Sequence, residues 1–175
     1  MTIYRDMSCN TSLPRIIFKE PYTKILSQFK SPITFLEIGL NTGNSLIGWK
    51  SFFPSGSQIC GIDITLKNIQ ADLNGYYVFE MDSTNKELVN KTFKDGMFDV
   101  IVDDASPDKH IETFQVFKHK MKNNGTYLIE TFRTPTAFEI YRKLLSSESD
   151  FLIKYQRVMG NSFLVCTKLW TLHKE

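Results

Sequence analysis

The sequence has few cysteines, little net charge and no long apolar run. Its 175 residues include three cysteines, and Cys60 and Cys166 lie far apart in apolar segments. Because a disulfide framework or a zinc site needs clustered or regularly spaced cysteines, we expect neither. The formal net charge of +2 is too small to indicate a nucleic-acid-binding surface, so a nucleic-acid partner is disfavoured.

Targeting and membrane-spanning segments are also missing. No apolar segment approaches the length of a membrane span, and the first residues lack the apolar core of a secretory signal. We therefore expect a cytoplasmic protein without a membrane partner. The chain has no internal repeat or low-complexity segment, and its length fits one domain. We predict an N-terminal arm over residues 1–13 and a single domain over residues 14–175.

What the sequence does contain is a strand, turn, helix and strand pattern. The apolar run from Ile33 to Ile38 meets a turn that holds Gly39 and Gly43, and a helix-like segment leads to a second apolar run, Gln58 to Ile62, followed by Asp63. Parallel strands joined by a helix form a right-handed crossover, and the ligand site of such a sheet lies at the carboxyl ends of its strands. The pattern predicts an α/β fold with a site at this edge.

Four residues of the pattern are predicted to surround a ligand: Glu37, Gly39, Gly43 and Asp63. The glycines allow a ligand to approach the backbone and the N–H groups that open the helix, and Asp63 can accept hydrogen bonds from the two hydroxyls of a ribose. The spacing Glu-x-Gly-x-x-x-Gly lacks the third glycine of a dinucleotide site. We therefore predict a nucleoside ligand without a diphosphate, which disfavours an NAD-dependent oxidoreductase.

Acidic residues follow two further strand-like runs. Val100 to Val102 forms an apolar run that ends at Asp103 and Asp104. Adjacent carboxylates repel each other unless a cation or hydrogen-bond donors hold them, which favours a functional site. Asp82 follows another strand-like run, Tyr76 to Met81. Two compatible roles are open for Asp82 or its neighbours: contact with the ligand, and the N-cap of the next helix.

The segment EIGLNTGNSLIGWKSFFPSGSQICGIDI resembles motif I of the S-adenosylmethionine-dependent methyltransferases with a Rossmann-like sheet. Within them it is most similar to the group that includes macrolide-sugar O-methyltransferases, and the similarity runs from about Pro21 to Phe132. The resemblance implies a seven-stranded, mostly parallel sheet with helices on both faces and a C-terminal antiparallel hairpin. The alternating segments Phe151 to Arg157 and Ser162 to Leu169 indicate such a hairpin independently.

The same resemblance implies S-adenosyl-L-methionine as the cofactor and O-methylation of a small-molecule or sugar hydroxyl as the reaction. The cofactor-binding residues that it implies are Glu37, Gly39, Gly43, Asp63, Asp82 and Asp103. An RNA ribose is a lesser alternative as acceptor, because Glu130 stands where RNA ribose methyltransferases resemble one another in having lysine. A homo-oligomer is left open.

The chain departs from the family at two catalytic positions. The family pattern DDGSH is DDASPD here, so Pro107 replaces the histidine that would take a proton from the acceptor, and Asp104 and His110 remain as candidate catalytic residues. The pattern YVIED is YLIET here, so Thr131 replaces one acid of a metal site and leaves Asp104 and Glu130 as candidate ligands for Mg²⁺. These changes favour a metal-free reaction, and a catalytically degenerate cofactor-binding subunit is the alternative.

Four local predictions also bear on the site. Pro21 is expected near the start of a helix, and Tyr22 is expected to pack in the core rather than against the ligand. Asp108 is expected to cap a helix that runs to Met121. A histidine in the first turn of such a helix is usually exposed, which makes a surface position the simplest expectation for His110.

Overall fold

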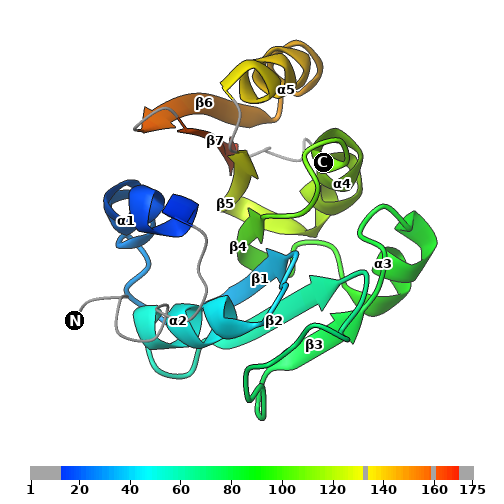
Figure 1. Cartoon of the computed structure of the whole chain (residues 1–175). Coiled ribbons are helices and arrows are strands. Elements are labelled where there is room, and N and C mark those ends of the chain that lie inside the picture. The colour runs from blue at the N-terminus through cyan, green and yellow to red at the C-terminus, as the bar shows by residue number, and fades with distance from the viewer. Residues whose placement is uncertain (1–12, 132–133, 159–160, 170–175) are drawn as a thin grey trace.

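A computed structural model describes residues 13–131, 134–158 and 161–169 of the chain (Figure 1). The strands are β1 (Thr34–Ile38), β2 (Gln58–Asp63), β3 (Tyr77–Glu80), β4 (Phe98–Asp103), β5 (Met121–Thr131), β6 (Phe151–Val158) and β7 (Asn161–Lys168). The helices are α1 (Leu13–Leu26), α2 (Asn44–Phe52), α3 (Lys86–Thr92), α4 (His110–Phe117) and α5 (Thr134–Ser147), with a short 3-10 helix at Lys118–Lys120. None of the helices in the described ranges is long and apolar enough to cross a membrane.

The seven strands form one sheet in the order β3-β2-β1-β4-β5-β7-β6 (Figure 1). The first five strands run parallel, and β7 pairs antiparallel with both β5 and β6. This is the predicted Rossmann-like sheet with its C-terminal antiparallel strands. The strand order reverses at β1, which has β2 on one side and β4 on the other, and such a switch point leaves a crevice at the carboxyl ends of the strands.

Helices cover both faces of the sheet (Figure 1). The strands are apolar on both sides, so consecutive residues enter opposite cores. Ile101 and Tyr127 belong to the core under α3, α4 and α5, whereas Val100 and Leu128 belong to the core under α1 and α2. Because the apolar residues fill the middle of the sheet, its polar side chains collect at the strand ends.

The helix α1 packs through its second half. Tyr22 is buried, and its ring centroid lies 5.3 Å from that of Phe163 and 6.0 Å from that of Trp49, which confirms the core prediction. The expectation for Pro21 is wrong, because this residue lies inside the helix rather than near its start. A proline inside a helix removes one backbone hydrogen bond, so the packing of Tyr22 and Leu26 against the sheet outweighs that local cost.

The helix α4 is shorter than predicted at both ends. Lys109 rather than Asp108 occupies the N-cap position, and the Asp108 carboxylate instead accepts a hydrogen bond from the Ser106 hydroxyl. The chain leaves the helix early because Met121 is fully buried and already pairs with Phe98 as part of β5. Tertiary pairing therefore overrides the helical pattern of this segment.

Candidate active site

A pocket of about 550 Å³ lies at the carboxyl ends of β1, β2, β3 and β4. Its volume is typical of small-molecule sites. Four of the predicted site residues line it: Gly39, Asp63, Asp82 and Asp104. The other predicted residues, which are Glu37, Gly43, Asp103, His110 and Glu130, do not belong to its lining. The structure thus separates the acids of the strand ends into those that face the pocket and those that lie beneath it.

Gly39 brings the two sides of the pocket together. It has a φ of +88°, and a Cβ at this position would lie 2.6 Å from the main-chain oxygen of Asp104. Its N–H donates to the carbonyl of Ile62 at 2.9 Å. A side chain here would therefore be strained by the backbone angle and would also push away the segment that follows β4.

The Asp63 carboxylate in the pocket is held by three main-chain hydrogen bonds. Its Oδ2 accepts hydrogen bonds from the N–H groups of Leu40 and Asn41 at 2.7 and 3.1 Å, and its Oδ1 accepts one from Thr65 at 3.1 Å. These donors fix the plane of the carboxylate and use both lone pairs of Oδ2, while Oδ1 keeps one lone pair for a ligand in the pocket. The arrangement suits a contact with a ligand hydroxyl through Oδ1.

Gly43 has a packing role in the structure. It precedes α2 with a φ of +81°, and a Cβ there would meet the methyl groups of Leu73 and Ile69 at 3.1 and 3.2 Å. Its open side therefore faces the loop between β2 and β3 instead of the pocket. The positive φ at this turn still explains why the sequence has glycine here.

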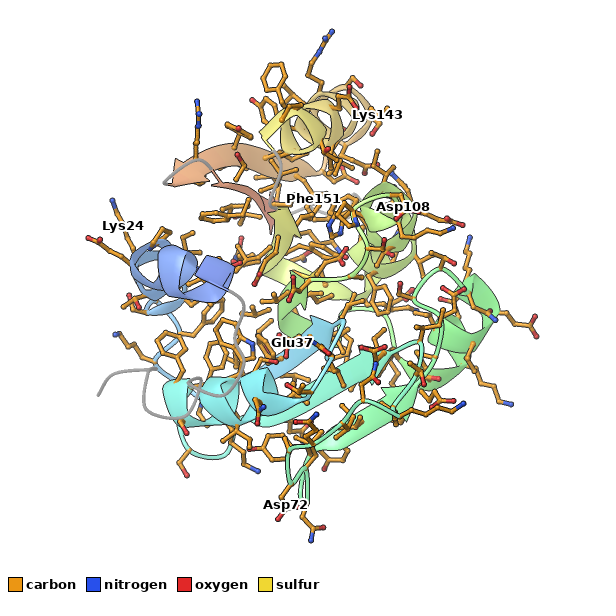
Figure 2. The ribbon with its side chains drawn as sticks, in the orientation of Figure 1. Lys24, Glu37, Asp72, Asp108, Lys143 and Phe151 are labelled. Atoms are coloured by element: carbon orange, nitrogen blue, oxygen red, sulfur yellow. The ribbon has the colours of Figure 1, made fainter. Side chains whose placement is uncertain are left out.

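Glu37 is fully buried and its carboxylate is turned toward α2. It accepts a hydrogen bond from the Ser45 hydroxyl at 2.6 Å, and the indole N–H of Trp49 donates to it at 3.4 Å. Figure 2 shows Glu37 in the interior of the molecule. These contacts join β1 to α2, the two elements that the glycine turn connects, so Glu37 stabilises their relative position.

Asp82 lines the pocket and does not cap the next helix. Its Oδ1 accepts hydrogen bonds from the N–H and the hydroxyl of Thr84 at 2.9 and 2.8 Å, and these two bonds lower the pKa of Asp82. The N-cap of α3 is Asn85, whose side chain accepts from the N–H of Leu88 at 3.1 Å. The N-cap therefore lies one residue beyond the residues predicted for it. Asp82 remains in the pocket as an ionised acid.

Asp103 lies under the pocket in a buried polar cluster. Its Oδ2 accepts a hydrogen bond from the Tyr127 hydroxyl at 3.0 Å, and its Oδ1 accepts one from the N–H of Ala105 at 3.2 Å. The same Oδ1 lies 3.1 Å from Nδ1 of His110. The two donors, together with the contact to His110, explain how a fully buried carboxylate is tolerated at the end of β4. No local pattern in the sequence pointed to Tyr127, which lies on the neighbouring strand.

His110 is fully buried, so the surface position expected for it is wrong. Because α4 begins at His110, the imidazole turns toward β4 and β5 together with Thr113, whose hydroxyl lies 2.9 Å from that of Ser83. Burial lowers the pKa of His110, but the charge of Asp103 and the contact with it outweigh burial, and the net pKa is raised. The contact with Asp103 is an ion-pair contact rather than a well-aligned hydrogen bond.

The two candidate metal ligands differ in their exposure to the pocket. Asp104 lines the pocket, whereas Glu130 is buried at the end of β5 and is not part of the pocket lining. Within the described ranges, no group of three or more His, Cys, Asp or Glu side chains is placed to hold a metal ion. A magnesium ion held by Asp104 and Glu130 would need its further ligands from water or substrate, and this site stays a prediction.

Sequence reasoning did not identify several residues of the pocket. Ser106 and Lys109 line it on the β4 side, and Asn41 and Ile64 line it on the β1 and β2 side. Lys109 lies 3.2 Å from Glu112, and this hydrogen bond raises the pKa of Lys109. Ser106 and Lys109 follow Asp103 and Asp104 closely in the DDASPDK segment. Their closeness in sequence to the predicted acids could therefore have identified them as pocket residues.

Comparisons with known proteins agree with this geometry. No protein-family model matches the chain. It is similar to the mycinamicin VI 2''-O-methyltransferase of Micromonospora griseorubida, with 33% identity in an alignment of 112 residues that covers 58% of this chain and 28% of that protein. The chain thus spans little more than a quarter of the length of this relative.

Solved structures share the fold. The MycE methyltransferase in complex with Mg, SAH and mycinamycin VI matches with a TM-score of 0.70 and 21% identity over 86% of this chain and 50% of that one. A provisionally named O-methyltransferase from Klebsiella pneumoniae matches with a TM-score of 0.73 and 10% identity over 93% of this chain and 83% of that one. The chain therefore shares the fold of solved methyltransferases, and over part of its length its sequence is similar to that of a macrolide-sugar O-methyltransferase.

Proposed function

We propose that the chain binds S-adenosylmethionine and transfers its methyl group to a hydroxyl of a small molecule or sugar. The observation that carries the proposal is the Asp63 carboxylate, which lines the pocket in an orientation fixed by three main-chain N–H groups. The sequence similarity to an O-methyltransferase supports the reaction class.

The pocket residues fit the cofactor. Asp63 is placed to accept a hydrogen bond from a ribose hydroxyl, and Asp82 and the exposed side chain of Ile64 lie in the same lining, next to the expected position of the base. Gly39 keeps the space between the two sides clear of a side chain. When bound, the cofactor supplies a methyl group on a positively charged sulfur. The acids Asp63, Asp82 and Asp104 give the pocket the complementary sign of charge.

Asp104 is the residue best placed to assist the acceptor. It lines the pocket on the side opposite Asp63, whereas His110 is fully buried and outside the lining. A carboxylate there would orient an acceptor hydroxyl and take its proton as the new bond forms. The remaining contribution of the protein is alignment of the two reactants, which can supply a large part of a rate enhancement. We propose no step that passes through a metal ion.

The proposed acceptor is a small molecule. One relative is named for methylation of mycinamicin VI, and a solved relative was crystallised with mycinamycin VI. In the part of the chain that the structure describes, the pocket is lined by the ends of the strands and the loops that follow them. The acceptor itself is to be identified by experiment.

Calorimetric titration with S-adenosylmethionine, S-adenosylhomocysteine and NAD tests the proposal first. We expect the two methionine-derived ligands to bind and NAD not to bind, and binding of NAD alone would refute the assignment. Transfer of a labelled methyl group to a panel of sugar and small-molecule hydroxyls tests the reaction. Tight cofactor binding with no transfer to any acceptor would favour the non-catalytic cofactor-binding subunit.

A further inference from the structure

The segment Asp104–Lys109 forms one side of the pocket, and we call it the pocket wall. It joins the last residue of β4, Asp103, to the first residue of α4, His110. Four of its residues line the pocket, Asp104 and Lys109 among them. The position of this wall therefore decides where Asp104 lies relative to anything bound against Asp63.

The two residues that flank the pocket wall contact each other. Nδ1 of His110 lies 3.1 Å from Oδ1 of Asp103, and both side chains are completely buried. This contact closes the wall into a short loop at its base. Closing a short loop restricts the conformations open to the residues inside it.

Asp103 also fixes the wall from within and from the side. Its Oδ1 accepts a hydrogen bond from the N–H of Ala105, inside the wall, at 3.2 Å. Its Oδ2 accepts one from the hydroxyl of Tyr127, on β5, at 3.0 Å. Asp103, His110 and Tyr127 do not line the pocket, so any influence on the reaction must pass through the wall.

The chemistry of this cluster is unusual for a core position. An apolar side chain at position 110 would join Phe114 and Phe117, which are fully buried on the same helix. Burying an imidazole beside a carboxylate instead carries a desolvation cost, which apolar packing would avoid. What the polar pair adds over an apolar one is an electrostatic attraction between the two ends of the wall.

We propose that His110 is a positioning residue: by its contact with Asp103 it holds the pocket wall, and with it Asp104, in the place that methyl transfer requires. The inference rests on the proposed function for its catalytic consequence. The structural part, that His110 orders the wall, does not depend on it. A displacement of about 1 Å in a reacting geometry is enough to slow a reaction by about a hundredfold.

Two substitutions of similar shape test the proposal, His110→Asn and His110→Leu. Asparagine keeps an N–H donor close to the position of Nδ1, whereas leucine has the same branching and no donor. Hydrogen–deuterium exchange of the cofactor-free protein is followed in peptides over the wall and over β6 and β7. We expect exchange in the wall to be about tenfold faster or more in His110→Leu, near wild type in His110→Asn, and unchanged in β6 and β7.

Calorimetry and kinetics complete the test. In His110→Leu we expect affinity for S-adenosylhomocysteine within about threefold of wild type and a kcat for methyl transfer at least tenfold lower, with recovery in His110→Asn. Equal behaviour of the two variants in exchange and in kcat would overturn the proposal. Faster exchange throughout the molecule in His110→Leu would also overturn it, because a global change would mean that His110 stabilises the whole core and not the wall in particular.

A second variant covers the case in which His110→Leu does not fold. Tyr127→Phe removes the other side-chain bond to Asp103, and we expect the same local loss of protection in the wall. Unchanged protection in that variant would overturn the role of the cluster. If the wild type does not bind S-adenosylhomocysteine, the proposed function fails, and the exchange data still decide whether His110 holds the wall.

Discussion

The ends of β1 and β2 hold their acids differently from the ends of β4 and β5. Asp63 faces the pocket, and main-chain N–H groups from residues close to the glycine turn hold it. Asp103 is buried, and it is held by the Tyr127 side chain on a neighbouring strand and by His110 on the next helix. The first arrangement depends on a local motif, and the second depends on three elements meeting.

This difference distinguishes an acid that lines the pocket from an acid that lies beneath it. The carboxylate held by the backbone depends little on side chains elsewhere in the sequence. The carboxylate held partly by side chains of other elements depends on those side chains. The departures from the family pattern, at Pro107 and Thr131, both lie on the β4 and β5 side.

The largest expected effect is at the pocket wall. Asp104→Asn should lower methyl transfer by about 10² to 10⁴-fold, because an amide cannot take the acceptor proton, with cofactor affinity nearly unchanged. Asp108→Asn is the matched control, since Asp108 is an exposed acid of the same wall that does not line the pocket (Figure 2).

Methyl transfer in wild type should be insensitive to a chelator. Sensitivity to it would overturn the metal-free proposal.

The contact between the two sides can be broken at Gly39. Gly39→Ala should destabilise the fold by about 2–4 kcal/mol, because the new Cβ would meet the main chain of Asp104 in a left-handed backbone conformation. Gly96 also has a positive φ, of +64°, but a Cβ added there would have no atom within 4 Å. Gly96→Ala should therefore destabilise the fold by only about 1 kcal/mol. Urea unfolding of both variants gives the comparison, and equal losses would mean that the close approach to Asp104 is relieved at little cost.

The β2 side is tested at Asp63. Asp63→Ala should weaken cofactor binding at least tenfold, since hydrogen bonds to a charged group contribute about 1.5–3 kcal/mol. Asp72→Ala removes a carboxylate from the exposed loop after β2 and serves as the control for net charge (Figure 2). Calorimetric titration measures both. A folded Asp63→Ala protein with unchanged affinity would refute the ribose contact.

The smallest effect is a pH dependence on the β4 side. The folded pKa of His110 is raised above its ordinary value of 6.5, with Asp103, Asp104 and the main chain of Glu130 near the ring. The stabilising contribution is therefore complete below pH 6.5 and is lost as the pH rises through the folded pKa. We expect the difference in unfolding free energy between wild type and His110→Leu to shrink as the pH rises through the folded pKa of His110. A difference that grows with pH would contradict this sign.

The sequence was sufficient for the fold and for four residues of the pocket lining, which are Gly39, Asp63, Asp82 and Asp104. Apolar runs, the glycine turn and the final alternating segments predicted the sheet, and the acids after β2, β3 and β4 predicted the pocket. These signals are local, because an acid after a buried strand must emerge at its carboxyl end. The cap of α3 at Asn85 was missed by one residue, because capping depends on the turn formed at Asp82 and Thr84.

The buried cluster could not be predicted in the same way. The spacing of DDASPDKH does not reveal that α4 begins at His110, one residue later than predicted, and one residue corresponds to a rotation of about 100° around the helix axis. Nor does an apolar strand reveal that Tyr127 points its hydroxyl at Asp103. Contacts of this kind depend on helix rotation and strand register, which become fixed only when the sheet is assembled.

The position of β7 has a consequence for how the chain folds. This strand pairs with β5 from Thr126 opposite Thr167 to Thr131 opposite Ser162, so β5 lacks one of its two neighbours until residues 161–168 have been synthesised. Until then β5 is an open edge with unpaired backbone groups, and open edges of this kind invite pairing with other chains. The nascent protein is thus most prone to aggregate just before its last described strand is added, and a chaperone that shields one strand would protect it.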